Sequence, residues 1–362
     1  MTGKRQNPSR DREATIKDVA REAGVSAMTV SRVINGKSNV RPATRDRIQK
    51  AVTKVNYRPN VGARLLGGRR TYQFLMLYNN PNVGWMGELL IGMMNSCRRI
   101  GYHLAIEGVG EFEGETAGAD VDAAEVARVI DGSRVDGIIL PPPICFNQTV
   151  LDVISAQGIP CVRIAGTSQS GIRLRVTIDN CAAAHEITSH LIDLGHEDIA
   201  IIKGPDLFVA SGLRFEGYAQ AMRQHGLAIR ESNIATGDFD VQSGYRCARK
   251  LLRQKHRPTA IFASNDEMAA GALSAAQELK ISVPERLSVA GFDDAPIAHS
   301  VWPKLTTVRQ PLRAMGEKSV ELLERYVRHM DDDTLEEVEP AISLGYKLVV
   351  RQSTGPCPFD KQ

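Results

Sequence analysis

Residues 14–60 read ATIKDVAREAGVSAMTVSRVINGKSNVRPATRDRIQKAVTKVNYRPN, and this stretch decides the fold of the amino-terminal part of the chain. Its first helix is marked by Thr15 and Asp18, which have the spacing of a capping box in which Thr15 accepts hydrogen bonds from first-turn amides. Gly24 is the residue type best suited to the left-handed conformation that follows a helix end. The pattern predicts a short helix and then a tight turn.

Two further helices follow the turn. Ser26 can cap the second helix, in which Val30, Val33 and Ile34 share one apolar face. The opposite face of this helix carries Met28, Ser31, Arg32 and Asn35. A third helix begins at Pro42, and its apolar stripe consists of Ile48, Ala51, Val52 and Val55. Two short helices, a tight turn and a supporting helix form a helix-turn-helix.

The charge of the chain is unevenly distributed. Residues 1–70 contain 17 Lys and Arg but 5 Asp and Glu, whereas the remainder contains 28 basic and 37 acidic residues. A basic module on an acidic body is typical of a protein that binds a polyanion, because phosphate contacts need clustered cations. A basic face that is merely solvated is the alternative.

The second helix has the side chains that reading DNA requires. Short residues at its start let it enter the major groove, where Arg32 can pair with a guanine edge and Ala27 and Met28 can contact thymine methyl groups. The alternative is a small helical domain whose Arg32 is solvated, and the excess of positive charge argues against it.

Residues 14–60 closely resemble the headpiece of the LacI/GalR family of bacterial transcription regulators, with the core pattern intact from Val25 to Val33. The resemblance implies a homodimer that binds double-stranded operator DNA. It also implies a set of DNA-contacting residues, namely Thr15, Ser26, Ala27, Met28, Thr29, Ser31, Arg32, Asn35, Asn39, Tyr57, Asn60, Ala63 and Leu66.

Residues 60–70 form a linker that is either flexible or, as the resemblance implies, a hinge helix that forms on DNA and wedges Leu66 into the minor groove. Such a wedge costs a few kcal/mol of base unstacking, which contacts to the bent duplex offset. Gly62 and Gly67 depart from the usual hinge pattern, and each costs about 1 kcal/mol relative to Ala in a helix. We therefore expect the free hinge to be disordered.

The body of the chain, from Tyr72 onward, alternates apolar strands with helices in two successive arrays. This order predicts an α/β core of two parallel-sheet subdomains with helices on both faces. Ligands in such folds bind beyond the carboxyl ends of the strands. With 362 residues and 43% apolar residues, the chain is long and apolar enough for a headpiece and a core of this kind.

The body resembles the same family and, through it, the periplasmic sugar-binding proteins, on the landmarks VTIDN (176–180), HLIDLGHEDIAIIKG (190–204), SNDEMAAGAL (264–273), SVAGFDD (288–294) and LTTVRQP (305–311). The expected organisation is a disordered tail at 1–14, a headpiece at 15–59, a linker at 60–70, a core at 71–352 and a tail at 353–362. Within the core we expect an N-subdomain of about 71–172 and 308–337, and a C-subdomain of about 173–307 and 338–352. The N-subdomain should take back a helix around Leu312 to Arg328, and the C-subdomain the strand near Ile342 to Val350.

The resemblance implies that the effector contacts are Trp85, Arg214, Asn265, Asp293 and Gln310. The polar members can hydrogen-bond hydroxyl groups, and the apolar face of a sugar can stack on Trp85. The alternatives are that Asn265, with Asp266, only caps a helix, that Trp85 only packs in the core, and that Asp293 is only a turn residue. Arg214 is expected to begin a helix, where the helix dipole gives a cation no advantage.

No motif for catalysis, a cofactor or a metal is present. His185 and His190 are five residues apart and do not share a helix face as a zinc pair must. The six cysteines have no metal-site spacing, so we expect reduced thiols. The polar amino terminus lacks a secretory signal, and no apolar run is long enough for a membrane helix, so a cytoplasmic protein is expected.

Three functions remain. The first, which we expect, is a transcription regulator that represses carbohydrate-utilisation genes and is controlled by a saccharide effector. The second is a cytoplasmic sugar-binding protein without a DNA function, which would leave residues 1–70 idle. The third is an unrecognised sugar-modifying enzyme. The carboxyl terminus has no leucine heptad, so we expect a dimer and not a tetramer.

Overall fold

The computed structural model describes residues 14–34, 40–55, 70–80, 82–110, 121–165, 172–331 and 338–358. The chain divides into two compact units, residues 1–71 and residues 72–362, which are treated separately below. No helix among the described residues is both long and apolar enough to cross a membrane.

The first unit is the expected three-helix headpiece, with α1 at Ile16–Ala23, α2 at Ala27–Ile34 and α3 at Pro42–Lys54. The N–H of Thr15 (2.9 Å) and its hydroxyl (2.6 Å) both donate to the Asp18 carboxylate at the start of α1. Gly24 ends α1 in the left-handed conformation, at φ 61°. The predicted apolar faces are confirmed at Val30, Val33, Ile48 and Ala51, while Val52 and Val55 are partly buried against the core and the side chain of Ile34 lies outside the part that the structure describes. The buried core consists of Val19, Ala20, Ala23, Val30, Val33, Ile48 and Ala51.

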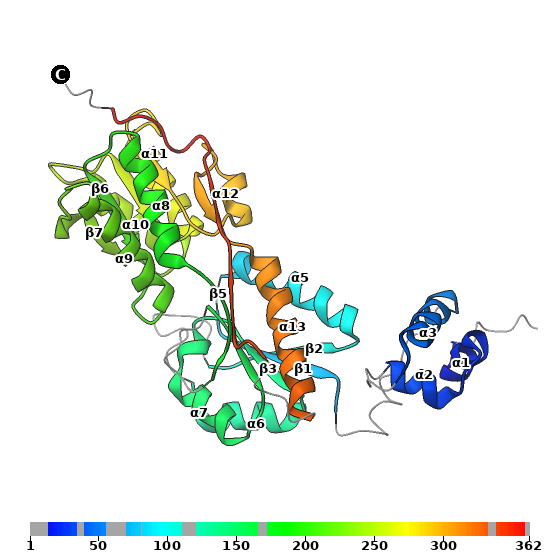
Figure 1. The fold of residues 1–362 in the computed structure, drawn as a ribbon. Helices are drawn as coiled ribbons and strands as arrows, with labels where there is room; N and C mark the ends of the chain where they lie inside the picture. The colour runs from blue at the N-terminus through cyan, green and yellow to red at the C-terminus, as the bar shows by residue number, and fades with distance from the viewer. Residues whose placement is uncertain are drawn as a thin grey trace, which may run out of the picture. The chain divides into compact units, whose positions relative to one another are not determined.

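The second unit contains two lobes (Figure 1). The N-lobe is built on a six-stranded parallel sheet of order β11-β5-β4-β3-β1-β2. Its strands are β1 (Gln73–Tyr78), β2 (His103–Gly108), β3 (Gly137–Leu140), β4 (Cys161–Ile164), β5 (Leu174–Ile178) and β11 (Ala341–Leu344). Helices α5 (Val83–Ile100) and α13 (Leu312–Asp331) cover one face, and α6 (Ala123–Ser133) and α7 (Gln148–Ala156) cover the other.

The C-lobe has a four-stranded parallel sheet of order β7-β6-β8-β9. Its strands are β6 (Ile199–Lys203), β7 (Ile234–Thr236), β8 (Ala260–Ala263) and β9 (Ser288–Ala290). Helices α8 (Asn180–Asp193) and α9 (Val209–Gln224) pack on one face, and α10 (Val241–Leu252) and α11 (Asp266–Glu278) on the other, with the short α12 (Pro296–Ser300) next to α11.

The expected subdomain boundaries are wrong at two crossings. Strand β5 was expected in the C-subdomain but pairs with β4 in the N-lobe sheet, because Leu174, Val176 and Ile178 bury their side chains in its core. The strand expected near Ile342 to Val350 divides in two. Its first part is β11, which pairs with β5, and its second part is β12 (Lys347–Val349), which pairs antiparallel with β10 (Thr307–Arg309).

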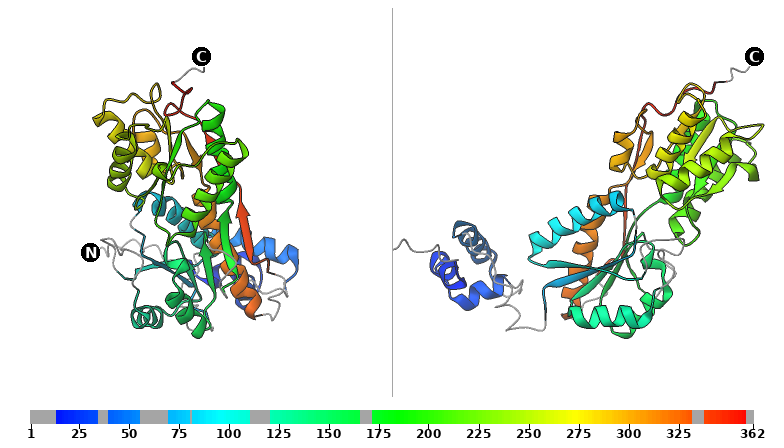
Figure 2. Two further views of the ribbon diagram at one scale, coloured as in Figure 1. Left: turned by 90° about the vertical axis from the view of Figure 1, so that its left-hand side faces the viewer. Right: turned by 180° about the vertical axis from the view of Figure 1, so that it is seen from behind.

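The carboxyl end of the core extends further than expected. Ser353 accepts a backbone hydrogen bond from Val289 (2.8 Å), and the N–H of Cys357 donates to Leu194 O (2.8 Å). Gly355 O lies 3.1 Å from Nε2 of the fully buried His196. Figure 2 shows the carboxyl-terminal segment, in red, running from one lobe to the other. Residues 353–358 are therefore part of the C-lobe and not a tail.

Candidate functional site

Helix α2 separates its packing side chains from the side chains that face outward. Val30 is fully buried, whereas Met28 is 67% exposed and Arg32 is also exposed. Ser26 caps the helix, because its Oγ accepts a hydrogen bond from the N–H of Thr29 at 3.1 Å. The exposed face of α2 therefore has the guanidinium and thioether groups that the sequence assigns to base contacts.

The other predicted DNA contacts differ in their burial and in whether the structure describes them. Ala27, Thr29 and Ser31 are partly buried on α2. The hydroxyl of Thr15 is bonded to Asp18, so its structural role is to hold the start of α1. Six further predictions lie outside the described residues: Asn35, Asn39, Tyr57, Asn60, Ala63 and Leu66.

In the second unit, Arg214 organises a buried group of side chains from several elements of the C-lobe. Its Nε donates to Asn180 Oδ1 (3.0 Å), and its Nη1 donates to Ser264 O (2.5 Å). Its Nη2 lies 3.6 Å from Asp293 Oδ1, and its guanidinium carbon lies 3.7 Å from the centre of the Phe292 ring. We use the name Arg214 cluster for Arg214, Asn265, Asp266, Asp293 and Gln310.

Arg214 does not begin its helix as expected. Helix α9 starts at Val209, so Arg214 lies in its second turn and its side chain is only 6% exposed. The helix start is therefore not what places this cation. Arg214 is held by the groups that it contacts across the ends of β8 and β9, and it belongs to the packing of the lobe as well as to the predicted site.

Asp293 is the acidic partner of Arg214 and lies in a strained turn, with φ at 113°. Burial raises the pKa of Asp293 to about 7, although Arg214 and a hydrogen bond from Gln310 oppose that rise. The Nε2 of Gln310 donates to Asp293 Oδ1 at 2.5 Å. The structure thus brings three of the five predicted effector residues, Arg214, Asp293 and Gln310, into one group that is joined by an ion pair and a hydrogen bond.

Asn265 does cap a helix. Its Oδ1 accepts from the N–H of Met268 (2.9 Å), and its Nδ2 donates to Phe239 O (2.9 Å) and to Glu267 Oε2 (2.9 Å). Every hydrogen-bonding group of this amide is used within the chain, so an effector contact by Asn265 would have to replace or share one of these bonds.

Trp85 packs in the hydrophobic core of the second unit and is 7% exposed. Its backbone N–H donates to Asn82 Oδ1 at 3.0 Å, which caps α5. The structure places this side chain as the core interpretation expects, and stacking against an effector stays a prediction.

The sequence analysis treated Asp266 only as a possible helix cap. In the structure its carboxylate is completely buried near that of Asp293. It accepts hydrogen bonds from the N–H of Ala295 (2.8 Å) and the hydroxyl of Thr307 (2.6 Å). Burial, with repulsion from Asp293, raises its pKa well above the ordinary value. Asp266 therefore fixes the turn that carries Asp293.

The sequence analysis did not name two further polar side chains at strand ends as candidate site residues. Asn79 follows β1 and Ser264 follows β8, and both are fully buried. Within the part of the chain that the structure describes, the amide of Asn79 and the hydroxyl of Ser264 have no hydrogen-bond partner. Their position after parallel strands was the available signal, since that is where ligands bind in such folds.

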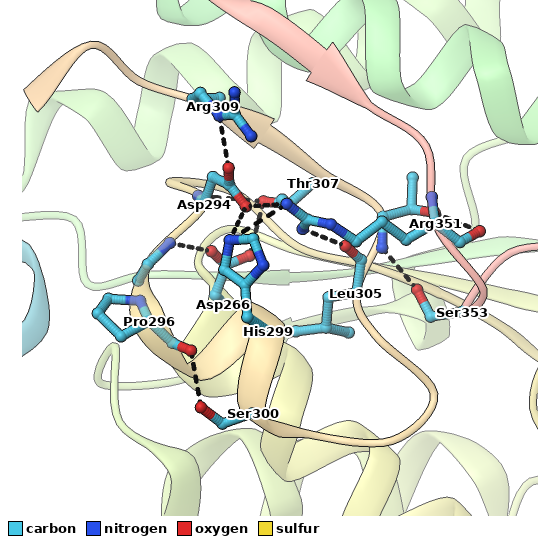
Figure 3. A network of polar contacts seen from close by, with 12 residues as sticks. Asp266, Asp294, Pro296, His299, Ser300, Leu305, Thr307, Arg309, Arg351 and Ser353 are labelled. Carbon is cyan, nitrogen blue, oxygen red and sulfur yellow. Dashed lines mark hydrogen bonds and ion pairs between the residues drawn. The ribbon is translucent and has the colours of Figure 1, made fainter.

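Asp294 anchors a second network next to the site (Figure 3). It pairs with Arg309 (2.6 Å), with Arg351 (2.5 Å) and with His299 (3.3 Å). Burial raises the pKa of Asp294, but hydrogen bonds from both arginines outweigh that effect and hold it below its ordinary value. Because Arg309 and Arg351 lie on chain segments that connect the lobes, this network fastens the connections to the turn that carries Asp293.

A groove of about 570 Å³ lies along α8 and is lined by Cys181, His185 and Tyr346, among others. None of the five predicted effector residues lines it. Within the Arg214 cluster, Asp293 contacts both Arg214 and Gln310, whereas Asn265 and Asp266 bond to residues outside the cluster. The described residues contain no group of His, Cys, Asp and Glu that could hold a metal ion.

A helix-turn-helix unit joined to two parallel α/β lobes defines a class of protein in which a DNA-binding headpiece is fused to a periplasmic-binding-protein-like core. Residues 15–60 match the model of the bacterial regulatory proteins of the lacI family, and residues 188–354 match the periplasmic binding protein-like domain. The chain belongs to the lacI family of bacterial transcription regulators.

Relatives match over nearly the whole chain. Catabolite control protein A of Priestia megaterium is 32% identical over 94% of this chain and 99% of that protein. The HTH-type transcriptional repressor PurR of Proteus mirabilis is 34% identical over 96% of this chain and 98% of that protein.

Solved structures agree with the fold. The transcriptional regulator CelR in complex with cellobiose has a TM-score of 0.69 at 29% identity, covering 94% of this chain and all (100%) of that one. The Lac repressor dimer bound to operator and the anti-inducer ONPF has a TM-score of 0.69 at 26% identity, covering 95% of this chain and 100% of that one.

Proposed function

We propose that this protein is a homodimeric repressor that binds a specific operator and whose operator affinity is set by a small-molecule effector, of the saccharide class, at the Arg214 cluster. The observation that carries the proposal is the buried group of Arg214, Asp293 and Gln310 at the strand ends of a core that is joined to a DNA-binding headpiece.

The chemistry of the cluster supports a polyol ligand. The carboxylate of Asp293 accepts hydrogen bonds, while the guanidinium of Arg214 and the amide of Gln310 donate them, so together they match hydroxyl groups that both donate and accept. Ser264 and Asn79 add unbonded polar atoms in the described residues. The CelR structure, which holds cellobiose, supports the same class.

On the DNA side, we propose that α2 enters the major groove with Arg32 and Met28 foremost. Leu66 then wedges into the minor groove at the centre of a near-palindromic operator with a deformable central step, such as CG. Footprinting tests the symmetry. A single asymmetric footprint, or a Leu66→Ala protein that binds as tightly as the wild type, would refute this arrangement.

Exposed apolar side chains support the dimer. On α5, Met94 is 57% exposed and Ile91 is 40% exposed, and they are three residues apart on one side of the helix. Large exposed apolar side chains that lie together mark protein interfaces. Light scattering on the wild type and on Met94→Glu tests whether this face joins the protomers.

The effector is tested by a thermal-shift screen over sugars and purines. A ligand at 100 times its dissociation constant adds about 2.7 kcal/mol of stability. Each positive compound is then titrated against operator binding by fluorescence anisotropy. A compound that binds the core but leaves operator affinity unchanged is not the effector, and turnover of a sugar, seen by chromatography, would favour an enzyme instead.

A further inference from the structure

Glu267, in the first turn of α11, lies where the two lobes of the core meet. A Cβ atom placed on Gly84, in the first turn of α5, would lie 3.4 Å from Glu267 Oε1, 3.7 Å from Asn82 Oδ1 and 3.8 Å from Cδ of Pro296. Gly84 and Asn82 belong to the N-lobe, while Glu267 and Pro296 belong to the C-lobe. The start of α5 therefore lies close to the starts of α11 and α12.

The carboxylate of Glu267 lies between residues of both lobes. Within the C-lobe, Oε2 accepts a hydrogen bond from Asn265 Nδ2 at 2.9 Å. Burial raises the pKa of Glu267, and hydrogen bonding from the Asn82 side chain opposes that rise. Asn82 at the same time caps α5 through the N–H of Trp85.

These contacts lead to two residues that the sequence assigned to the effector site. Asn265 is one predicted contact, and Asn82 fixes the backbone of Trp85, which is another. The carboxylate also lies at the first turn of α11, where the helix dipole favours a negative charge. We infer that Glu267 is a positioning residue of the effector site, which ties Asn265 on the C-lobe to Asn82 and Trp85 on the N-lobe and so holds the lobes together at this point.

This inference rests on the proposed function for the meaning of the site, but it can be tested with neither effector nor DNA. The chain has two tryptophans, and Trp302 is 80% exposed while Trp85 is buried beside the contact. In a Trp302→Phe background, Trp85 alone reports whether the start of α5 stays covered. The measurements are its emission maximum and its acrylamide quenching constant.

The decisive variant is Asn82→Asp. Aspartate caps a helix as well as asparagine does, so the bond to the Trp85 N–H is kept, but the neutral amide beside Glu267 is replaced by a second carboxylate. The two acids repel, and we expect the lobes to part here and the quenching constant of Trp85 to rise about twofold or more. Adding Glu267→Gln restores a donor and acceptor pair in reversed order, and the double variant should return to within about 20% of the starting value.

Asn147→Asp is the matched control, because Asn147 caps α7 of the same lobe through the N–H of Val150 at 3.2 Å. It should leave the quenching of Trp85 unchanged. Circular dichroism confirms that each variant is folded.

An unchanged quenching constant in Asn82→Asp would overturn the inference. A rise that Glu267→Gln does not reverse would also overturn it, because the effect would then not pass through Glu267. Either failure leaves the proposed function standing, which is tested separately by the effector screen and the operator titrations.

Discussion

Replacing Arg214 by methionine should destabilise the core strongly, and not only remove an effector contact. Arg214 is 6% exposed and its partner Asp293 is 4% exposed. Breaking a buried ion pair by removing one member costs about 3–5 kcal/mol, because the other charge stays buried without compensation. The carbonyl of Ser264 and the amide oxygen of Asn180 lose their donor as well.

A double-mutant cycle identifies the source of this loss. If the uncompensated carboxylate dominates, Arg214→Met with Asp293→Asn should recover about 2 kcal/mol relative to Arg214→Met alone. Urea unfolding followed by circular dichroism gives the free energies of unfolding. The control is Arg223→Met on the exposed side of the same helix, where the change should stay within about 0.5 kcal/mol.

The loss in Arg214→Met should also depend on pH. The pKa of Asp293 in the fold, about 7, is already above its ordinary value, and losing Arg214 raises it further. A carboxyl whose pKa is raised by folding destabilises the fold fully above the folded pKa, and this penalty disappears as the pH falls. The variant should therefore lose more stability at pH 8 than at pH 6. The reasoning would be refuted if Arg214→Met lost less than about 1 kcal/mol of unfolding free energy at pH 8. It would also be refuted if the effects of the two single substitutions simply added in the double variant.

Four other predictions concern single positions. Arg32→Ala should cost about 1–3 kcal/mol of operator binding and relax the preference at one base pair, measured on an operator library; equal weakening on all sequences would make Arg32 a phosphate contact. Asp18→Ala should lower the stability of the headpiece by about 1 kcal/mol in thermal unfolding, because it removes the acceptor for Thr15. Burial lowers the pKa of His196 below 6.5, so only the unfolded chain gains the proton as the pH drops below 6.5; stability should fall there in the wild type and less in His196→Gln. Ser264→Ala should weaken binding of the effector found in the screen about tenfold by calorimetry without lowering stability, since its hydroxyl has no partner in the described residues.

The headpiece was predictable because local rules determine it. The capping pair, Gly24 and the apolar spacing of Val30 and Val33 all act within a few residues, and the structure confirms the three helices. The membership of strands in the sheets was not predictable in the same way. Nothing local shows whether the strand at 174–178 belongs to the first lobe or the second, because that is decided by its pairing with β4 and β11.

The candidate site was likewise predictable only in part. Family resemblance selected Arg214, Asp293 and Gln310, and the structure brings them together. The buried contacts of Asp266, and the role proposed for Glu267, could not be predicted because they depend on partners far away in the chain, Thr307 for Asp266 and Asn82 for Glu267. The sequence shows that Asp266 and Glu267 are acidic and follow a helix cap. It does not show which side chains from other elements contact them in the fold.

If the effector binds at the Arg214 cluster as proposed, the adjacency of Asp293 and Asp294 gives a physical route from the effector to the relative orientation of the lobes. An effector shifts operator affinity only by the difference in its own affinity for the two lobe orientations. Asp293 faces Arg214, while the next residue, Asp294, holds Arg309 and Arg351 on the segments that connect the lobes. Asp266 fixes the same turn through the N–H of Ala295. A ligand that changes the position of Asp293 therefore changes the geometry of the connecting segments through a single peptide bond, and no longer chain of intermediates is required.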